Sequence, residues 1–130
     1  MSYYFHKLLN NKTFEETIEQ VTLELKGEGF GILTEIDIKK TLKEKIDADF
    51  KRYTILGACN PNFAYRALQS EDKIGAFLPC NVIVEEHESG GVEVSIVDPI
   101  ASMMAIKNDE LGGIATEVQD KLKRVMAQLG

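Results

Sequence analysis

The feature that most constrains this fold is an apolar stripe near the carboxyl end of the chain. Behind an Asn108-Asp109 helix cap, apolar residues recur every three or four positions: Leu111, Ile114, Ala115, Val118, Leu122, Val125, Met126 and Leu129. This spacing places them all on one face of a helix. A helix with so long an apolar face needs a long partner surface, and we expect a β-sheet to supply it.

Alternating apolar and polar residues predict the strands of that sheet. Residues 82–86 and 92–98 alternate and are joined through Ser89-Gly90-Gly91, which predicts an antiparallel hairpin. Further strands are predicted at residues 3–7, 30–36 and 53–59. The pattern therefore indicates an α+β domain with one sheet.

Capping residues mark the starts of helices between these strands. Thr13 and Glu16 form a capping box ahead of an amphipathic helix that Gly27 ends, and Asp37 caps a short Lys-rich helix. Asn60-Pro61 begins another helix, because Asn is a favoured cap and Pro fits the first helical position. The buried side of that helix is expected to be Ala64, Ala67 and Leu68. We expect a single domain, residues 1–130, with the helices mainly on one face of its sheet.

Charge and hydropathy exclude several classes of function. With 15 basic and 21 acidic residues the net charge is −6, the wrong sign for binding nucleic acid or an anionic membrane. The longest mostly apolar run, residues 74–84, is far shorter than the ~20 residues that span a bilayer. Residues 1–11 show no secretory signal, so we expect a cytoplasmic protein with reduced thiols.

Cys59 is the residue best placed for chemistry. It ends a predicted strand and precedes the helix cap Asn60, so its sulfur should lie near unpaired N–H groups at the positive end of the helix dipole. Such a position lowers the pKa of a thiol and favours the nucleophilic thiolate. The alternative is that Cys59 is a small buried apolar residue, which is common for free cysteine.

Cys80 offers a partner for Cys59 if their strands are neighbours, although a disulfide needs Cα atoms within about 7 Å. The alternative interpretation is that Cys80 is simply a core residue. A zinc site built from Cys59, Cys80, His6 and His87 is a second alternative, but these spacings match no zinc finger or ribbon. We therefore expect no bound metal and no cofactor. Glu85, Glu86 and Glu88 flank the hairpin and are interpreted as solvated.

Polar residues near the two Asx-Pro steps suggest a binding site. Asn60, Asn62 and Arg66 cluster at the start of one helix, and Asp98 caps the next Pro-started segment. Converging helix N–H groups can bind an anion, whereas the alternative is that these residues serve only as caps and turns. Asn81, in the second Cys-Asn dipeptide, completes the expected ligand-binding set.

Several of these motifs together resemble a known family. They are LGACNP at residues 56–61, AYRAL at 64–68, LPCNV at 78–82, GFG at 29–31, the Lys-rich helix and the Asp98-Pro99 step. The chain is similar over essentially its whole length to domain of unknown function family 302. The resemblance implies a small α+β fold with TATA-binding-protein-like topology, in which a curved, largely antiparallel sheet carries a long C-terminal helix. It does not transfer DNA binding.

Three functions follow as hypotheses. The first is a binding or accessory module that holds a small molecule or anion near the Cys59-Asn60-Pro61 corner. The second is a thiol-dependent sulfur or redox protein that uses Cys59 as thiolate, with Cys80 as its partner. The third is a purely structural interaction protein. A homodimer is also expected, because a small open sheet leaves exposed edges and the first strand carries Tyr3, Tyr4 and Phe5.

Overall fold

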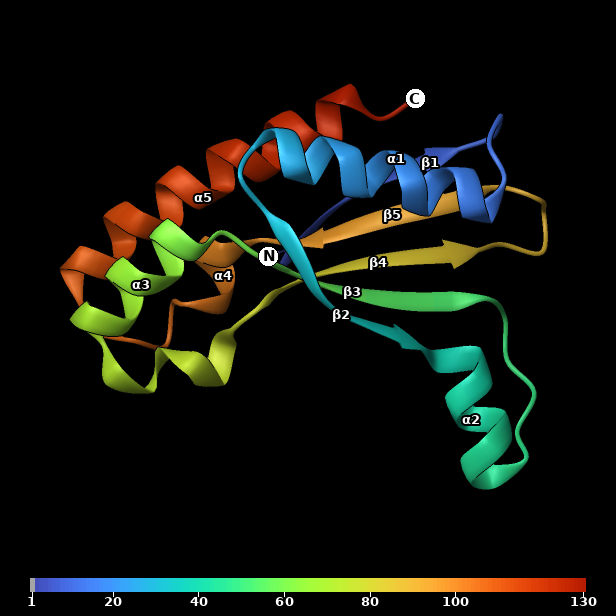
Figure 1. The fold of residues 1–130 in the computed structure, drawn as a ribbon, viewed down its shortest axis with the longest axis horizontal. Helices are drawn as coiled ribbons and strands as arrows, with labels where there is room; N and C mark the ends of the chain where they lie inside the picture. Colours follow the sequence, from blue (N-terminus) through green and yellow to red (C-terminus); the bar gives the residue numbers. More distant parts are fainter. Residues whose placement is uncertain (1) are drawn as a thin grey trace.

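The computed structural model describes residues 2–130, which form one five-stranded sheet with helices around it (Figure 1). The strands are β1 (Tyr4–Leu9), β2 (Gly31–Asp37), β3 (Tyr53–Cys59), β4 (Cys80–Glu86) and β5 (Val92–Val97). The helices are α1 (Phe14–Gly27), α2 (Ile38–Ile46), α3 (Pro61–Ser70), α4 (Pro99–Ser102) and α5 (Asp109–Gln128), with a 3₁₀ helix η1 (Asp72–Phe77). The order across the sheet is β1-β5-β4-β3-β2, and every neighbouring pair is antiparallel. The predicted α+β class and antiparallel sheet are confirmed.

Helices α1 and α5 cover one face of the sheet and create the core (Figure 1). Because side chains alternate along a strand, every second residue of the central strands points toward these helices. The fully buried members of this set include Leu56, Val82, Val84, Val94 and Ile96. Seven of the eight apolar positions predicted for α5 and its C-cap are buried, and the eighth, Met126, packs against the core.

The predicted helix caps are also present. Thr13 and Glu16 form a reciprocal capping box, in which the Glu16 N–H donates to Thr13 Oγ1 at 3.0 Å and the Thr13 N–H donates to Glu16 Oε1 at 2.9 Å. Four more side chains accept backbone N–H groups at helix starts: Asp37, Asn60, Asp98 and Asn108. Local sequence therefore fixes where each of these helices begins.

Gly57 lies where side chains from two other segments closely approach the backbone of β3. A Cβ at this position would lie 2.2 Å from Thr34 Oγ1 and 2.7 Å from Pro79 Cγ. The pairing of β2 with β3 is irregular between Ile32 and Thr34, beside this contact. The absence of a side chain at Gly57 thus lets β2 and the segment before β4 flank β3.

Two parts of the structure differ from the sequence prediction. Leu68 was expected on the buried side of α3, but it is 43% exposed. Ala67 is the one fully buried residue of that helix. The residues after α3 form η1, which the sequence did not predict, and Ile74 anchors it in the core.

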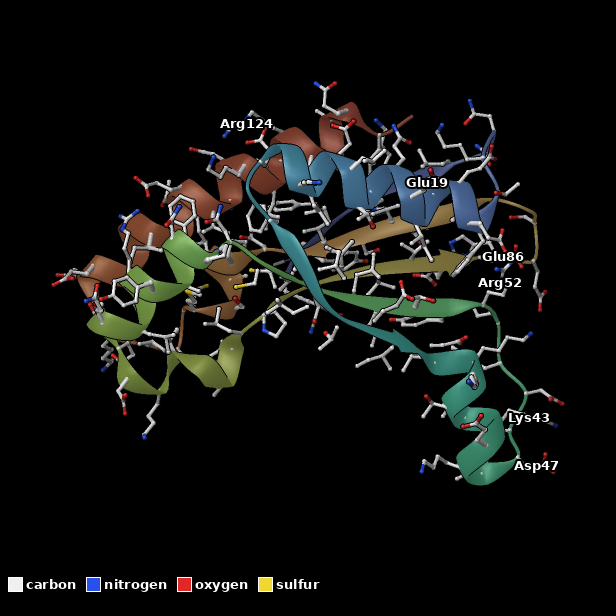
Figure 2. All side chains as sticks on the ribbon, in the orientation of Figure 1. Glu19, Lys43, Asp47, Arg52, Glu86 and Arg124 are labelled. Atoms are coloured by element: carbon white, nitrogen blue, oxygen red, sulfur yellow. The ribbon has the colours of Figure 1, made fainter. Side chains whose placement is uncertain are left out.

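Helix α2 lies apart from the core at one end of the sheet, and no residue in it is fully buried. Figure 2 shows Lys43 and Asp47 on this outlying helix, where Lys43 Nζ lies 2.9 Å from Asp47 Oδ1. The four lysines of α2 are all exposed.

The sheet face turned away from α1 and α5 is hereafter the open face. Its central side chains come from alternate positions of four strands: Tyr4, His6, Tyr53, Ile55, Asn81, Ile83, Glu85, Glu93, Ser95 and Val97. All of them except Ser95 are exposed or half-buried. One face of the sheet thus builds the core, and the other leaves most of its side chains exposed or half-buried.

Substitution of two leucines in α1 tests which side of this helix belongs to the core. Leu25 is fully buried and Leu23 is 62% exposed. We expect Leu25→Ala to lower the free energy of unfolding by about 2–5 kcal/mol, because it removes packed methyl groups and leaves a cavity. Leu23→Ala should change it by less than about 0.5 kcal/mol. Urea denaturation measures both, and equal losses would contradict the assigned core.

Candidate functional site

The corner between β3 and α3 brings three of the predicted site residues together. Cys59, Asn60 and Cys80 line one small apolar pocket of about 30 Å³, beneath α3 and α5. Cys80 pairs with Ala58, the residue before Cys59, so the two cysteines lie on neighbouring strands. This pocket, hereafter the corner pocket, is about the size of one water molecule.

Both polar atoms of the Asn60 side chain form hydrogen bonds to backbone groups of the chain. Its Nδ2 donates to the Glu28 carbonyl at 3.3 Å, and its Oδ1 accepts the Phe63 N–H at 3.5 Å. Gly29 has a φ of 88°, and a Cβ there would lie 2.9 Å from Asn60 Nδ2. Asn60 is therefore a cap and a bridge to the loop after α1 rather than a free ligand-binding group.

The other residues predicted near the corner are engaged elsewhere. Arg66 Nη1 donates to Glu117 Oε2 on α5 at 2.9 Å, and Asn62 is exposed at the start of α3. Asp98 Oδ1 accepts the Ile100 N–H and Gln119 Nε2, each at 3.0 Å. The structure does not gather these groups around one anion-sized space.

The two thiols have raised pKa values. Burial raises the pKa of Cys59, the opposite direction from the one expected beside a helix N-terminus. Burial, together with the neighbouring Cys59, raises the pKa of Cys80 to about 11. Desolvation disfavours the thiolate at this corner because most of the surrounding side chains are apolar. Both cysteines are thus neutral thiols near pH 7.

A larger hollow lies on the open face. This groove, hereafter the open-face groove, has a volume of about 370 Å³. Its lining comes from β1, β3, β4, β5 and the residue before β1: Tyr3, Tyr4, Tyr53, Asn81, Ile83, Glu85, Glu93, Ser95 and Val97. Asn81 is the one predicted site residue that lies here, on the face opposite the corner pocket.

The groove has an aromatic part and a charged part. Tyr3 and Tyr4 pack with ring centroids 5.0 Å apart, and Tyr53 lies on β3 beside Ile83 and Glu85 of β4. Burial and the nearby Glu85 carboxylate raise the pKa of Tyr53, so its hydroxyl stays protonated and can donate a hydrogen bond.

Two carboxylates form the charged part. Glu85 and Glu93 are direct partners across β4 and β5, and basic side chains compensate them. Lys51 Nζ lies 2.6 Å from Glu85 Oε1, and this contact raises the pKa of Lys51. Burial alone would raise the pKa of Glu93, but its hydrogen bonds with His87 and His6 outweigh burial and leave that pKa below its usual value.

Sequence reasoning missed this groove because it treated Glu85 as a solvated hairpin residue. The signal was available in the hairpin itself. Once the pairing of β4 with β5 is fixed, Glu85 must face Glu93, and Ile83 must face Ser95 on the same side of the sheet. The contribution of Tyr3, Tyr4 and Tyr53 depends on strand order, which hairpin patterning does not determine.

None of the helices formed by residues 2–130 has the length and apolar composition needed to cross a bilayer.

The raised pKa of Cys80 predicts a stability change at alkaline pH. Because the pKa of about 11 in the folded protein exceeds the ordinary thiol pKa of 9.0, the neutral thiol contributes stability that is complete below pH 9 and lost as pH rises toward 11. Between pH 9 and 11 the free energy of unfolding of wild type should fall by about 2–3 kcal/mol more than that of Cys80→Ala, because each pKa unit corresponds to about 1.4 kcal/mol. Urea denaturation at several pH values measures the difference. Cys59→Ala is the comparison variant: burial raises the pKa of this half-buried thiol as well, but the buried Cys80 remains, so the variant should keep most of the loss of stability at alkaline pH. A pH-independent gap between wild type and Cys80→Ala would contradict the assignment.

Comparison with known proteins places the fold in a family. No curated protein matches the sequence. The crystal structure of an uncharacterized conserved protein DUF302 from Bacillus stearothermophilus is similar to this chain, with a TM-score of 0.92 and 27% sequence identity over 100% of both chains. The model of the family "Domain of unknown function DUF302" matches residues 5–129. The chain therefore belongs to the DUF302 family, as its motifs indicated.

Proposed function

We propose that this protein is a small-molecule-binding module and that its ligand lies in the open-face groove. The observation that carries the proposal is a groove of about 370 Å³ whose lining combines three tyrosines with paired carboxylates. Small-molecule sites are typically concave, largely apolar and supplied with a few converging polar groups. The volume falls within the range of about 300–1,000 Å³ that such sites occupy.

The lining also indicates the class of ligand. Tyrosine rings favour a flat molecule that stacks on them, and Ile83 and Val97 add apolar contact. Glu85 and Glu93 place negative charge at one end, which disfavours an anion and favours a neutral or cationic group. The ligand class that fits best is therefore a flat, partly apolar molecule with a cationic or hydrogen-bond-donating group.

This proposal moves the binding site away from the corner where the sequence suggested it. The corner pocket has room for about one water molecule, and Asn60 is occupied by its capping contacts. Of the expected ligand-binding residues, Asn81 keeps that role because it lines the open-face groove.

A thiol function is the second candidate, because Cys59 and Cys80 line one pocket on neighbouring strands. In this alternative Cys59 is the attacking thiol and Cys80 its partner. Its support is weaker, since burial raises the pKa of both thiols and thus reduces the thiolate fraction at neutral pH. A Cys59 that reacts with iodoacetamide at pH 7 no faster than free cysteine would remove this alternative.

Matched aromatic probes test the groove. Benzylamine and benzoate have similar shapes and opposite charges, and we expect benzylamine to bind more tightly because of Glu85 and Glu93. Tyr53→Ala should weaken benzylamine binding by roughly five-fold, because a lost aromatic contact costs on the order of 1 kcal/mol. Amide shifts in two-dimensional NMR give both the affinity and the location of binding.

Tyr65→Ala is the control variant, since Tyr65 lies on α3 and is 65% exposed outside the groove. It should bind benzylamine like wild type. Benzoate binding as tightly as benzylamine, or shifts confined to the corner pocket, would contradict the proposal.

A homodimer remains a prediction, and the edges of the sheet support it. Both β1 and β2 have one side without a strand partner among residues 2–130, and Tyr3 and Tyr4 are exposed at the β1 edge. Phe5 does not share this surface, because Lys123 Nζ lies over its ring at 5.6 Å. Light scattering at high micromolar concentration should give the mass of two chains, and the mass of one chain would contradict the dimer.

A further inference from the structure

An unusual pair of carboxylates lies at the charged end of the open-face groove. Glu85 of β4 and Glu93 of β5 are directly opposite each other in the antiparallel register. Like charges in that position repel and destabilise the pair. Both carboxylates are also shielded from water, with side-chain exposures of 15% and 19%. A cation between them would relieve this repulsion.

Two imidazoles complete the group. His87 Nε2 lies 2.9 Å from Glu93 Oε1, and His6 Nδ1 lies 2.7 Å from Glu93 Oε2. One ligand atom each from Glu85, His87 and Glu93 can be chosen so that all three lie within 4.8 Å of one another. Within residues 2–130, this is the one group of three or more metal-ligating side chains that meets this spacing. These three residues and His6 are hereafter the carboxylate–imidazole cluster.

We propose that the carboxylate–imidazole cluster binds a divalent first-row transition-metal ion, with Zn²⁺ as the best-fitting probe. Glu85, His87 and Glu93 are the three ligands, and His6 holds the second oxygen of Glu93. Imidazole nitrogen and carboxylate oxygen are common zinc ligands, and a hydrogen-bonded partner behind a ligand is typical of such sites.

Metal binding requires only a small rearrangement of these side chains. Zinc binds nitrogen and oxygen at about 2.0–2.2 Å, so tetrahedral ligand atoms lie about 3.3–3.6 Å apart. The 2.9 Å contact between His87 and Glu93 is already shorter than this, and the largest separation in the group, within 4.8 Å, must shrink by roughly 1 Å. Rotation of side chains can provide this movement. Three protein ligands leave a fourth position for water or for a molecule in the groove.

Lys51 competes with a metal at this site. Its ammonium group lies 2.6 Å from Glu85 Oε1 and supplies the positive charge that the carboxylate needs. Lys51 precedes β3, and its side chain is 38% exposed, so it can turn toward solvent when a metal binds. This competition gives the proposal an unusual consequence: removal of the lysine charge should strengthen metal binding.

The inference departs from the sequence prediction of no metal. That prediction considered the two cysteines with His6 and His87, whose spacings match no zinc finger or ribbon. The cluster instead assembles from β1, β4, β5 and the residue after β4, so only strand pairing brings its members together. The metal site does not rest on the proposed small-molecule function and stands if benzylamine fails to bind.

Calorimetric titration of chelator-treated protein with Zn²⁺ at pH 7 tests the site. We expect one saturable equivalent with a dissociation constant of about 10 µM or tighter. His87→Gln and Glu93→Gln should each weaken binding at least about ten-fold. Lys51→Met should strengthen it by roughly ten-fold, because a competing charge is lost. Cys59→Ala is the control for thiol binding and should leave the affinity unchanged.

The visible spectrum of the Co²⁺-loaded protein gives a second readout, because it reports the coordination of the metal directly. It should change in His87→Gln and stay unchanged in Cys59→Ala. His87 is more exposed than either carboxylate, so His87→Gln keeps the test valid if Glu93→Gln does not fold. Three results would overturn the proposal: no saturable binding below about 100 µM, equal affinity in wild type and His87→Gln, or loss of binding in Cys59→Ala.

Discussion

The packing of α1 and α5 against a single face of the sheet is the interaction on which the other features depend. It buries the side chains of the central strands that point toward the helices, including Val84, Val94 and Ile96, together with Leu25 and Leu122 from the helices. The apolar area removed from water by this contact is the main stabilising contribution in a domain of this size. Because both helices lie on one side, the alternate side chains of the same strands are left on the opposite face.

The open face has consequences that follow from strand geometry. Every residue that places an apolar side chain in the core puts its neighbours on the other side of the sheet. On β4 and β5 these neighbours include Ile83, Glu85, Glu93 and Ser95, which line the groove between tyrosines of β1 and β3. The buried face therefore fixes the positions of the exposed groups. A side chain in the groove is held by the core beneath it, which limits the reorganisation needed to bind a ligand.

The polar side chains near the two pockets differ in what they contact. Around the corner pocket, Asn60 and Asp98 use their oxygens to cap helices, and Arg66 pairs with Glu117. On the open face, the carboxylates of Glu85 and Glu93 contact the side chains of Lys51, His6 and His87 rather than backbone amides. A ligand or a metal ion can replace such partners without removing a helix cap.

Local signals in the sequence predicted much of the fold. The Thr13-Glu16 capping box, the Asn60-Pro61 step and the stripe of α5 each act within a few residues, so they are readable without the tertiary structure. The exposure of Leu68 was not predictable in this way, because the face that α3 buries depends on its angle to α5. The pKa of Cys59 was predicted in the wrong direction, since the helix terminus was visible in sequence and the apolar neighbours were not.

The candidate site was harder to predict for the same reason. Its members are spread from Tyr3 to Val97, and their convergence depends on the order β1-β5-β4-β3. The hairpin indicates that Glu85 faces Glu93. The pairing of β1 with β5, in contrast, joins the first and last strands of the chain, and no local pattern predicts it. Tyr4 thus joins the groove, and His6 joins the carboxylate–imidazole cluster, through topology and not through any motif.

Crystals soaked separately in several small organic solvents would test most directly whether the open face is the binding surface. Solvent molecules of different chemistry tend to gather where a protein offers both apolar contact and converging polar groups. Our interpretation predicts that different solvents overlap in the open-face groove, between Tyr53 and Val97. Overlap in the corner pocket beside Cys59, with an empty open-face groove, would contradict it.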